Sequence, residues 1–410
     1  MKLFPKNVHV FRFVHEGPLG PYMDSYVDEM HQQGYATATI QAHVGLLTDF
    51  SRWLARHQLA AQQISGELFP RYLRSRQRRL WRLKHNDPSA LKGMLNLLIR
   101  NGVTAEPARP SPSPADQLLD EFASYLRKEK ALAPRTIIGY SFFVGQFLAK
   151  RFGTGPADLS TLSSSDVIEF VRHRAASMKC PHKSLTKSLR SFLRFGRYRG
   201  DLRTDLAACV PPIATRDLAN LPKAIPADQT ELVLATCDRT TTVGRRDYAI
   251  LLILARLGLR AIELVRLRLE DLDLQNGWIT VRGKNGRFSQ LPLPVEVGEA
   301  LADYLRRGRP KSASRSVFLR TTAPIAGFKN SGTVSSVAKN AVLRTGIRSL
   351  KTGAHQFRHG LATSMLQRGA SLPEIAELLR HRSFRTTALY ARVDLNTLRA
   401  LALPWPGSAS

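Results

Sequence analysis

The chain has 410 residues, of which 43% are hydrophobic and 23% charged, and this excludes a single small domain and predicts a folded protein of two or three domains. Lysine and arginine number 61 against 32 acidic residues, which gives a formal net charge of +29. A field of that sign attracts polyanions, so nucleic acid is the favoured partner. A ribosome-associated or merely basic protein would carry the same charge.

No sequence pattern indicates a metal centre, a cofactor site or a disulfide framework. The three cysteines, Cys180, Cys209 and Cys237, fall in no Cys-x-x-Cys or Cys/His cluster. No apolar run approaches the ~20 residues of a membrane span, and the N-terminus has no apolar signal segment. We therefore expect no metal, no cofactor and no membrane partner, and a cytoplasmic location with the bacterial nucleoid.

Two segments rich in proline divide the chain. The first is EPARPSPSPA at residues 106–115, and the second contains the prolines of residues 209–225. Proline removes a helical hydrogen bond, so neither segment is expected to be helical. The predicted parts are an N-terminal helical domain, a second helical domain, a C-terminal domain and a tail, at residues 1–105, 116–208, 226–392 and 393–410.

The two helical parts resemble each other. Residues 23–40 run parallel to residues 119–137, and each stretch continues into an amphipathic helix. Thr39 and Thr136 stand near the starts of these helices, where a hydroxyl can cap amides or touch a phosphate, and Arg135 stands beside the second. A real duplication and the general likeness of small helical domains both fit this pattern.

A basic stretch, residues 183–197, closes the second helical part. Basic residues alternate with leucine and phenylalanine, so one helix face is expected in the core and the other against a DNA backbone. A solvated charged face is the alternative. The residues expected at DNA are Lys183, Lys187, Arg190 and Arg194.

The C-terminal part is predicted to be mixed. Residues 248–254 indicate a buried helix that stops near Gly258. Residues 272–274, 278–281 and 288–293 are predicted to be antiparallel strands, because Asn-Gly pairs separate them. Helix is expected again from Ala354.

Two histidines, an arginine and a late tyrosine follow at a characteristic spacing. They occur in HQFRH (residues 355–359), LRH (residues 379–381) and TTALY (residues 386–390), preceded by LGLRAIEL (residues 257–264) and VRGKNGR (residues 281–287). This set resembles the active site of the tyrosine recombinase (phage integrase) family. Residues 116–208 are similar to the helical core-binding domain of that family. The resemblance implies a multidomain, mainly α protein with a small antiparallel β-sheet: helical DNA-binding domains and an α+β catalytic domain.

The resemblance also implies six catalytic residues: Arg260, Lys284, His355, Arg358, His381 and Tyr390. Tyr390 would be the nucleophile, and cations must activate it because a phenol has an ordinary pKa of about 10. Arg260 and Arg358 would clamp the phosphate through paired donors. In this family these cations do the work that magnesium does in metal enzymes.

The remaining roles are proton transfer and hydrogen bonding. His355 would accept the proton of Tyr390 or donate to the phosphate, and His381 would donate a further hydrogen bond. Lys284, at the hairpin tip, would protonate the leaving 5′ oxygen, with Lys351 and Arg287 as rivals. Arg287 is also a candidate DNA contact.

Three neighbouring residues are interpreted as supporting. His359 is expected to be structural, and Glu263 to support the helix that follows Arg260. Family members usually have Leu-Gly-His where this chain has Leu379-Arg380-His381, so Arg380 is expected to point outward or onto DNA. An apolar stripe in residues 393–410 predicts a tail that docks on a neighbouring protomer, with packing on its own domain as the alternative.

The resemblance implies a site-specific recombinase of a mobile element that cuts and rejoins double-stranded DNA through a 3′-phosphotyrosyl intermediate and a Holliday junction. A dimer on each site, a tetramer in the synapse, and accessory DNA-bending or co-recombinase proteins are the expected partners. A type IB topoisomerase, which shares the tyrosine chemistry, and a non-cleaving DNA-binding remnant are the alternatives. A metal-dependent transposase is disfavoured because no acidic triad has a supporting context.

Overall fold

The computed structural model describes residues 13–80, 87–106, 112–153, 155–177, 183–212, 224–283, 286–347, 353–381 and 383–391. The chain divides into two compact units: residues 107–219 form one, and residues 1–106 together with 220–410 form the other. No helix in the described ranges is long and apolar enough to cross a bilayer.

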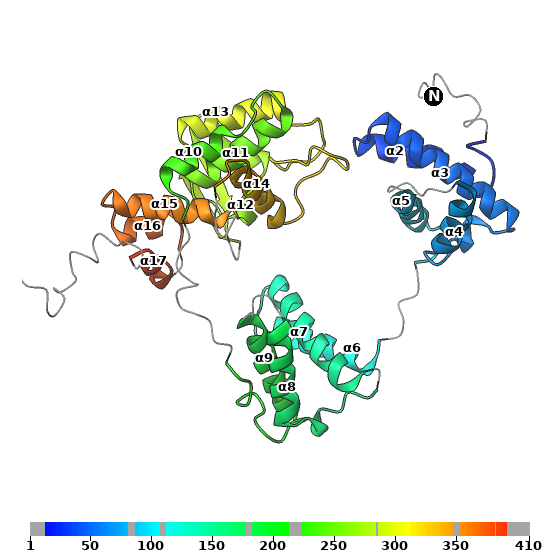
Figure 1. The fold of residues 1–410 in the computed structure, drawn as a ribbon, viewed down its shortest axis with the longest axis horizontal. Coiled ribbons are helices and arrows are strands. Elements are labelled where there is room, and N and C mark those ends of the chain that lie inside the picture. Colours follow the sequence, from blue (N-terminus) through cyan, green and yellow to red (C-terminus); the bar gives the residue numbers. More distant parts are fainter. Residues whose placement is uncertain are drawn as a thin grey trace, which may run out of the picture. The chain divides into compact units, whose positions relative to one another are not determined.

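The N-terminal segment is a group of helices with a core of its own (Figure 1). On α3, the buried residues Ile40, Val44, Leu47 and Leu54 recur every three to seven positions, which is the period of a helix with one apolar face. The helices are α2 (Met23–Gln32), α3 (Thr37–Arg56), α4 (Leu68–Leu80) and α5 (Asp87–Arg100), with short 3₁₀ turns at Gly20–Tyr22 and Ala61–Gln63.

The second unit is a separate helical body with its own core. Its helices are α6 (Pro114–Lys128), α7 (Pro134–Phe152), α8 (Ser164–Ser177) and α9 (Lys183–Arg199), with a 3₁₀ turn at Leu159–Thr161. Helix α6 starts inside the segment expected to be a linker. Its start is favoured because the Ser113 hydroxyl accepts from the Asp116 amide, and proline suits the first helical position.

The C-terminal segment surrounds one helix that is buried on almost all sides, α11 (Thr242–Arg256). Gly258, with φ +56°, follows the helix end and confirms the predicted stop. The other helices are α10 (Ala227–Ala235), α12 (Ala261–Arg266), α13 (Val295–Asp303), which runs into a π-helical turn at Tyr304–Gly308, α14 (Ser331–Arg344), α15 (His355–Gln367), α16 (Leu372–Leu378) and α17 (Phe384–Ala391).

A three-stranded antiparallel sheet in the order β1-β2-β3 joins this core. The strands are β1 (Leu272–Asp273), β2 (Trp278–Arg282) and β3 (Phe288–Pro292), with Ile279 opposite Leu291 and Val281 opposite Ser289. Gly277 turns between the first two strands with φ +70°. A mainly helical chain with one small antiparallel sheet confirms the predicted fold class.

Candidate active site

Arg260 stands directly before α12 and is fixed by Glu263. Its backbone N–H donates to Glu263 Oε2 (2.8 Å), and its Nη1 donates to Oε1 (2.8 Å). The Glu263 carboxylate thus accepts a hydrogen bond from a backbone amide at the start of the helix, and it also orients the Arg260 guanidinium. The Arg260 side chain is 35% exposed, so its outer edge is open to a ligand.

Arg358 comes from α15 and is buried. Its guanidinium donates to the carbonyl oxygens of Gly258 and Leu379, so it joins the end of α11 to the end of α16. Burial, together with the charges of Arg260 and Arg380, lowers the pKa of Arg358 to about 9. A buried cation beside other cations lacks compensating negative charge, so the binding of an anion such as a phosphate would stabilise it.

The prediction that Arg380 points outward is wrong. Its Nη2 donates to Glu263 Oε2 (3.0 Å), and its side chain is 13% exposed. Glu263 is 2% exposed and therefore needs compensating charge. Burial tends to raise the pKa of Glu263, but Arg380 and Arg260 outweigh that effect and hold it below its ordinary value.

Tyr390 lies on α17 and is 2% exposed. Its hydroxyl shares a 2.9 Å hydrogen bond with Nδ1 of His359. His359 lies one turn after His355 on the same face of α15, and the two rings are stacked at 6.1 Å. His359, interpreted from the sequence as structural, therefore becomes a candidate proton acceptor for Tyr390. Burial raises the pKa of Tyr390, while Arg358 and Arg260 act to lower it.

The two predicted catalytic histidines, His355 and His381, both have pKa values below the ordinary value of a histidine. The His381 ring lies 6.3 Å from the Tyr390 ring and almost parallel to it, and its Nδ1 shares a 2.8 Å hydrogen bond with Thr387 Oγ1. Burial and the nearby arginines lower the pKa of His381 to about 4. His355, the first residue of α15, keeps an exposed edge, and burial with Arg358 and Arg260 also lowers its pKa. Neutral imidazoles can accept a proton or donate one hydrogen bond.

Five of the six predicted catalytic residues therefore meet, around the starts of α12 and α15, the turn after α16, and α17. Lys284 lies outside the described residues. The Gly283 N–H donates to the Arg287 carbonyl (2.8 Å), which pairs the chain on either side of residues 284–285.

The candidate DNA contacts lie at helix starts and on α9. Thr39 is partly exposed in the first turn of α3, Arg135 is exposed and Thr136 partly exposed in the first turn of α7, and Arg287 is exposed beside β3.

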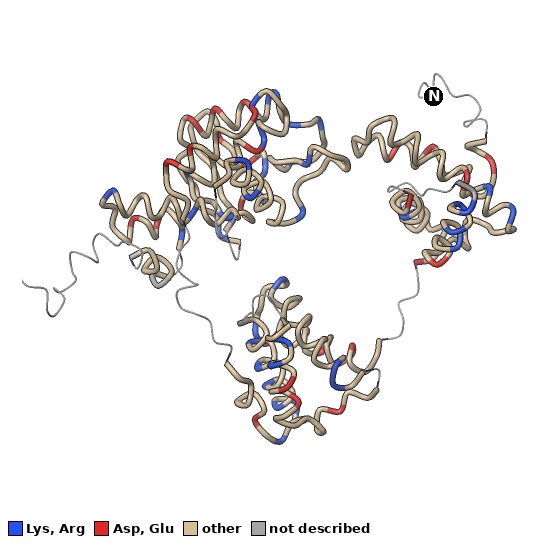
Figure 2. Tube along the Cα trace, in the orientation of Figure 1, with Lys and Arg blue, Asp and Glu red and all other residues tan. Residues whose placement is uncertain are grey.

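Basic residues lie along the length of α9, as Figure 2 shows. Lys187 and Arg194 are exposed, while Leu185, Leu189 and Phe192 on the other face are buried. Arg190 differs from these two exposed residues, because its Nη2 donates to the Val210 carbonyl (2.7 Å). This hydrogen bond connects α9 to the segment that follows it. Lys183 begins the helix, but its side chain is outside the described residues.

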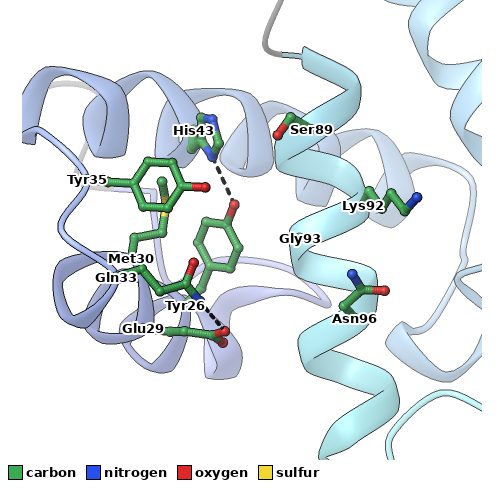
Figure 3. Close-up of a pocket in the computed structure, with 10 residues that line it drawn as sticks. All are labelled: Tyr26, Glu29, Met30, Gln33, Tyr35, His43, Ser89, Lys92, Gly93 and Asn96. Atoms are coloured by element: carbon green, nitrogen blue, oxygen red, sulfur yellow. Dashed lines mark hydrogen bonds between the residues drawn. The ribbon is translucent and has the colours of Figure 1, made fainter. Parts of the chain in front are cut away.

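Sequence reasoning missed a polar hollow of about 240 Å³ between α2, α3 and α5 (Figure 3). Gly93 makes room for it, since a Cβ there would come within 2.9 Å of the Tyr26 hydroxyl. That hydroxyl shares a 2.9 Å hydrogen bond with His43, whose pKa burial lowers. No sequence motif indicates the hollow, because its lining residues come from helices that are separated in the sequence. Its lining is Tyr26, Glu29, Met30, Gln33, Tyr35, His43, Ser89, Lys92, Gly93 and Asn96.

Residues 223–396 match the model of the phage integrase family. A protein of Sinorhizobium fredii named "Putative integrase/recombinase y4rA" is 45% identical over 397 residues, which cover 96% of this chain and 96% of the relative. Tyrosine recombinase XerD of Listeria innocua is 32% identical over 288 residues, covering 68% of this chain and 94% of the relative.

Solved structures share the fold. The XerH site-specific recombinase bound to a palindromic difH substrate matches with a TM-score of 0.56 at 17% identity, covering 72% of this chain and 98% of that one. The Tn1549 transposon integrase in complex with a circular intermediate DNA matches with a TM-score of 0.51 at 18% identity, covering 68% and 99%.

Proposed function

The chain belongs to the phage integrase family, and we propose that it performs site-specific recombination with Tyr390 as its nucleophile. The observation that carries the assignment of residues is a buried phenol, Tyr390, that is hydrogen-bonded to His359 and lies close enough to Arg260 and Arg358 for their charges to act on it. Such a group can bind a phosphodiester, attack it and accept the proton that the attack releases.

The reaction balances with this chain's own residues. The Tyr390 oxygen attacks the scissile phosphorus while its proton passes to His359 or His355. The bond from phosphorus to the 5′ oxygen breaks, and Lys284 supplies the proton that this oxygen takes up. A 3′-phosphotyrosyl link remains. The 5′-hydroxyl of a partner strand then attacks the link and passes its proton to Lys284, while the Tyr390 oxygen leaves and takes back the proton held by the histidine.

The charge that develops on the phosphate is met by protein groups. Arg260 and Arg358 would bind the non-bridging oxygens, and His381 would donate one hydrogen bond. The energy of the broken bond is kept in the phosphotyrosyl ester, so the exchange needs no nucleotide cofactor. In this proposal the arginines provide the charge stabilisation that a magnesium ion provides in other phosphoryl-transfer sites.

The proposed partners are double-stranded DNA and further copies of the chain. The net charge of +29 and the exposed basic residues of α9 support DNA binding. Lambda integrase, which shares the fold at a TM-score of 0.53, has been solved as a tetramer bound to a Holliday junction. We propose the same arrangement here, with a dimer on each site and action at the bacterial nucleoid.

The N-terminal helices and the tail extend this proposal. The division into residues 1–105, 116–208 and 226–392 remains a proposal, which the four buried clusters support because none of them combines residues of two of these parts. The alignment with the putative integrase/recombinase of Sinorhizobium fredii includes the N-terminal helices, which supports their being part of the recombinase. The proposed docking of residues 393–410 on a neighbouring protomer concerns residues outside the described ranges.

A strand-exchange assay tests the function. Two labelled duplexes from the DNA flanking the gene are incubated with the wild type or with Tyr390→Phe. We expect four-way junctions and exchanged strands from the wild type and neither from the variant. Relaxation of supercoiled DNA without junctions would indicate a topoisomerase instead. Binding without cleavage would indicate a DNA-binding remnant.

A further inference from the structure

The turn after α16 has an unusual residue at its tightest point. The Arg380 N–H donates to the Glu377 carbonyl (2.9 Å), and the His381 N–H donates to the Ala376 carbonyl (2.9 Å). These two bonds end a helix in the pattern that places one residue in the left-handed region, where glycine is normal. Arg380 occupies that position with φ +53°. A side chain held there against strain needs a compensating contact.

Glu263 provides that contact. Arg380 Nη2 lies 3.0 Å from Glu263 Oε2, and Arg260 Nη1 lies 2.8 Å from Oε1. Arg380 Nη1 also donates to the Leu378 carbonyl (3.3 Å), which limits its freedom. One buried carboxylate is therefore shared by two guanidiniums that come from segments far apart in the sequence.

The same turn also holds both candidate phosphate ligands by its backbone. The Leu379 carbonyl accepts from Arg358, and the Arg380 carbonyl accepts from Arg260 Nη2 (3.5 Å). The conformation of this turn therefore affects the direction of both guanidiniums.

An arginine at position 380 adds a positive charge to the site, which a glycine could not do. Arg260, Arg358 and Arg380 carry three positive charges against one negative charge on Glu263, a net of two. Without Arg380, Glu263 would neutralise Arg260, and a net of one would remain. A phosphodiester has one negative charge and gains more during attack, so the larger positive charge suits the reaction.

We propose that Arg380 is a positioning residue that shares Glu263 with Arg260, and thereby leaves more uncompensated positive charge at the site and directs the Arg260 guanidinium toward the scissile phosphate. The inference rests on the proposed function of the site. It predicts that Arg380 contributes to the rate of cleavage without touching the DNA.

Three substitutions separate charge from backbone strain. Arg380→Gln removes the charge and keeps the long side chain, Arg380→Gly removes the charge and the strain, and Arg380→Lys keeps a charge. Arg368→Gly, at an exposed arginine after α15, is the matched control. The rate of covalent adduct formation is measured on nicked duplexes from the DNA flanking the gene, with DNA affinity and melting temperature measured beside it.

We expect Gln and Gly to slow adduct formation by at least about tenfold, Lys to recover part of the rate, and the control to match the wild type. A second substrate carries an uncharged methylphosphonate at the mapped cleavage point. The loss caused by Gln or Gly should shrink on this substrate, because less charge must be stabilised there. A defect in folding would slow both substrates equally.

Two results would overturn the inference alone: wild-type rates for Arg380→Gln and Arg380→Gly, or a loss that is equal on both substrates. Failure of the proposed function has a different signature, since the wild type itself would then form no adduct on any flanking duplex. In that case the inference fails with it.

Discussion

At the scale of single residues, Tyr390 is held in a form that resists ionisation. The phenol is buried and hydrogen-bonded to His359, and burial raises its pKa, while Arg358 and Arg260 oppose the rise. Attack on a phosphate requires the hydroxyl proton of Tyr390 to be transferred to a base as the bond to phosphorus forms. The nearest described proton acceptor is the Nδ1 atom of His359, at 2.9 Å.

His359 is accordingly predicted to matter for cleavage. Replacing it with alanine removes the hydrogen-bond partner of Tyr390, and we expect adduct formation to slow by about 100-fold or more, as for loss of a general base. The rate is measured on a nicked duplex, with His173→Ala, at an exposed histidine of α8, as control. A rate within about twofold of the wild type, as for a group outside general-base catalysis, would return the role of proton acceptor to His355 alone.

His381 predicts how stability depends on pH. Its pKa is about 4 in the folded chain, against about 6.5 for an unfolded histidine. Between these values the unfolded chain binds the extra proton and the folded chain does not. The free energy of unfolding should therefore fall as the pH drops from about 6.5 toward 4.

Urea titrations at several pH values measure this effect, and His381→Asn should flatten the slope in that range. An unchanged slope in the variant would show that the low pKa of His381 does not contribute. Other groups with a lowered pKa, such as His355, would keep part of the pH dependence of stability in both the wild type and the variant.

At the scale of elements, the close approach at Gly258 joins α11 to the site. Its φ is +56°, and an added Cβ would lie 2.8 Å from a methyl carbon of Leu379 and 3.0 Å from one of Leu361. Gly258→Ala should lower the free energy of unfolding by about 2–4 kcal/mol, from strain and overpacking together.

Gly369→Ala provides the matched control for that prediction. Gly369 has φ +88° at the end of α15 and nothing within 4 Å of an added Cβ, so it should lose only about 1 kcal/mol from strain. Equal losses in the two variants, measured by urea unfolding, would contradict the close packing inferred at Gly258.

Local signals explain which elements could be predicted from the sequence. The end of α11 and the turn at Gly277 depend on glycines within a few residues of the element, so the sequence alone indicates them. The inward direction of Arg380 could not be predicted, because its partner Glu263 is 117 residues away. The contact of His359 with Tyr390 was missed for the same reason, since it requires α17 to pack on α15.

At the scale of the whole molecule, residues 107–219 have what an independent domain needs. Their core includes Phe122, Phe147 and Phe192, each almost fully buried, and it shares no residue with the other cores. We expect the isolated fragment 107–219 to be helical and to unfold cooperatively in urea. Phe192→Ala should lower its free energy of unfolding by about 3–5 kcal/mol.

Circular dichroism of that fragment checks the prediction. A gradual loss of signal without a transition would show that the unit needs the rest of the chain. The proposed boundaries of the other two parts would then also need revision, since they rest on the same evidence of separate cores.

The central claim is that Tyr390 becomes joined to the DNA. The most direct measurement is to trap the covalent complex on a nicked duplex in the presence of a chelator, digest it, and identify the modified peptide by mass spectrometry. We expect a nucleotide joined through its 3′-phosphate to the oxygen of Tyr390, and no adduct from Tyr390→Phe. An adduct at another residue, an adduct formed by the variant, or cleavage that stops in chelator would contradict it.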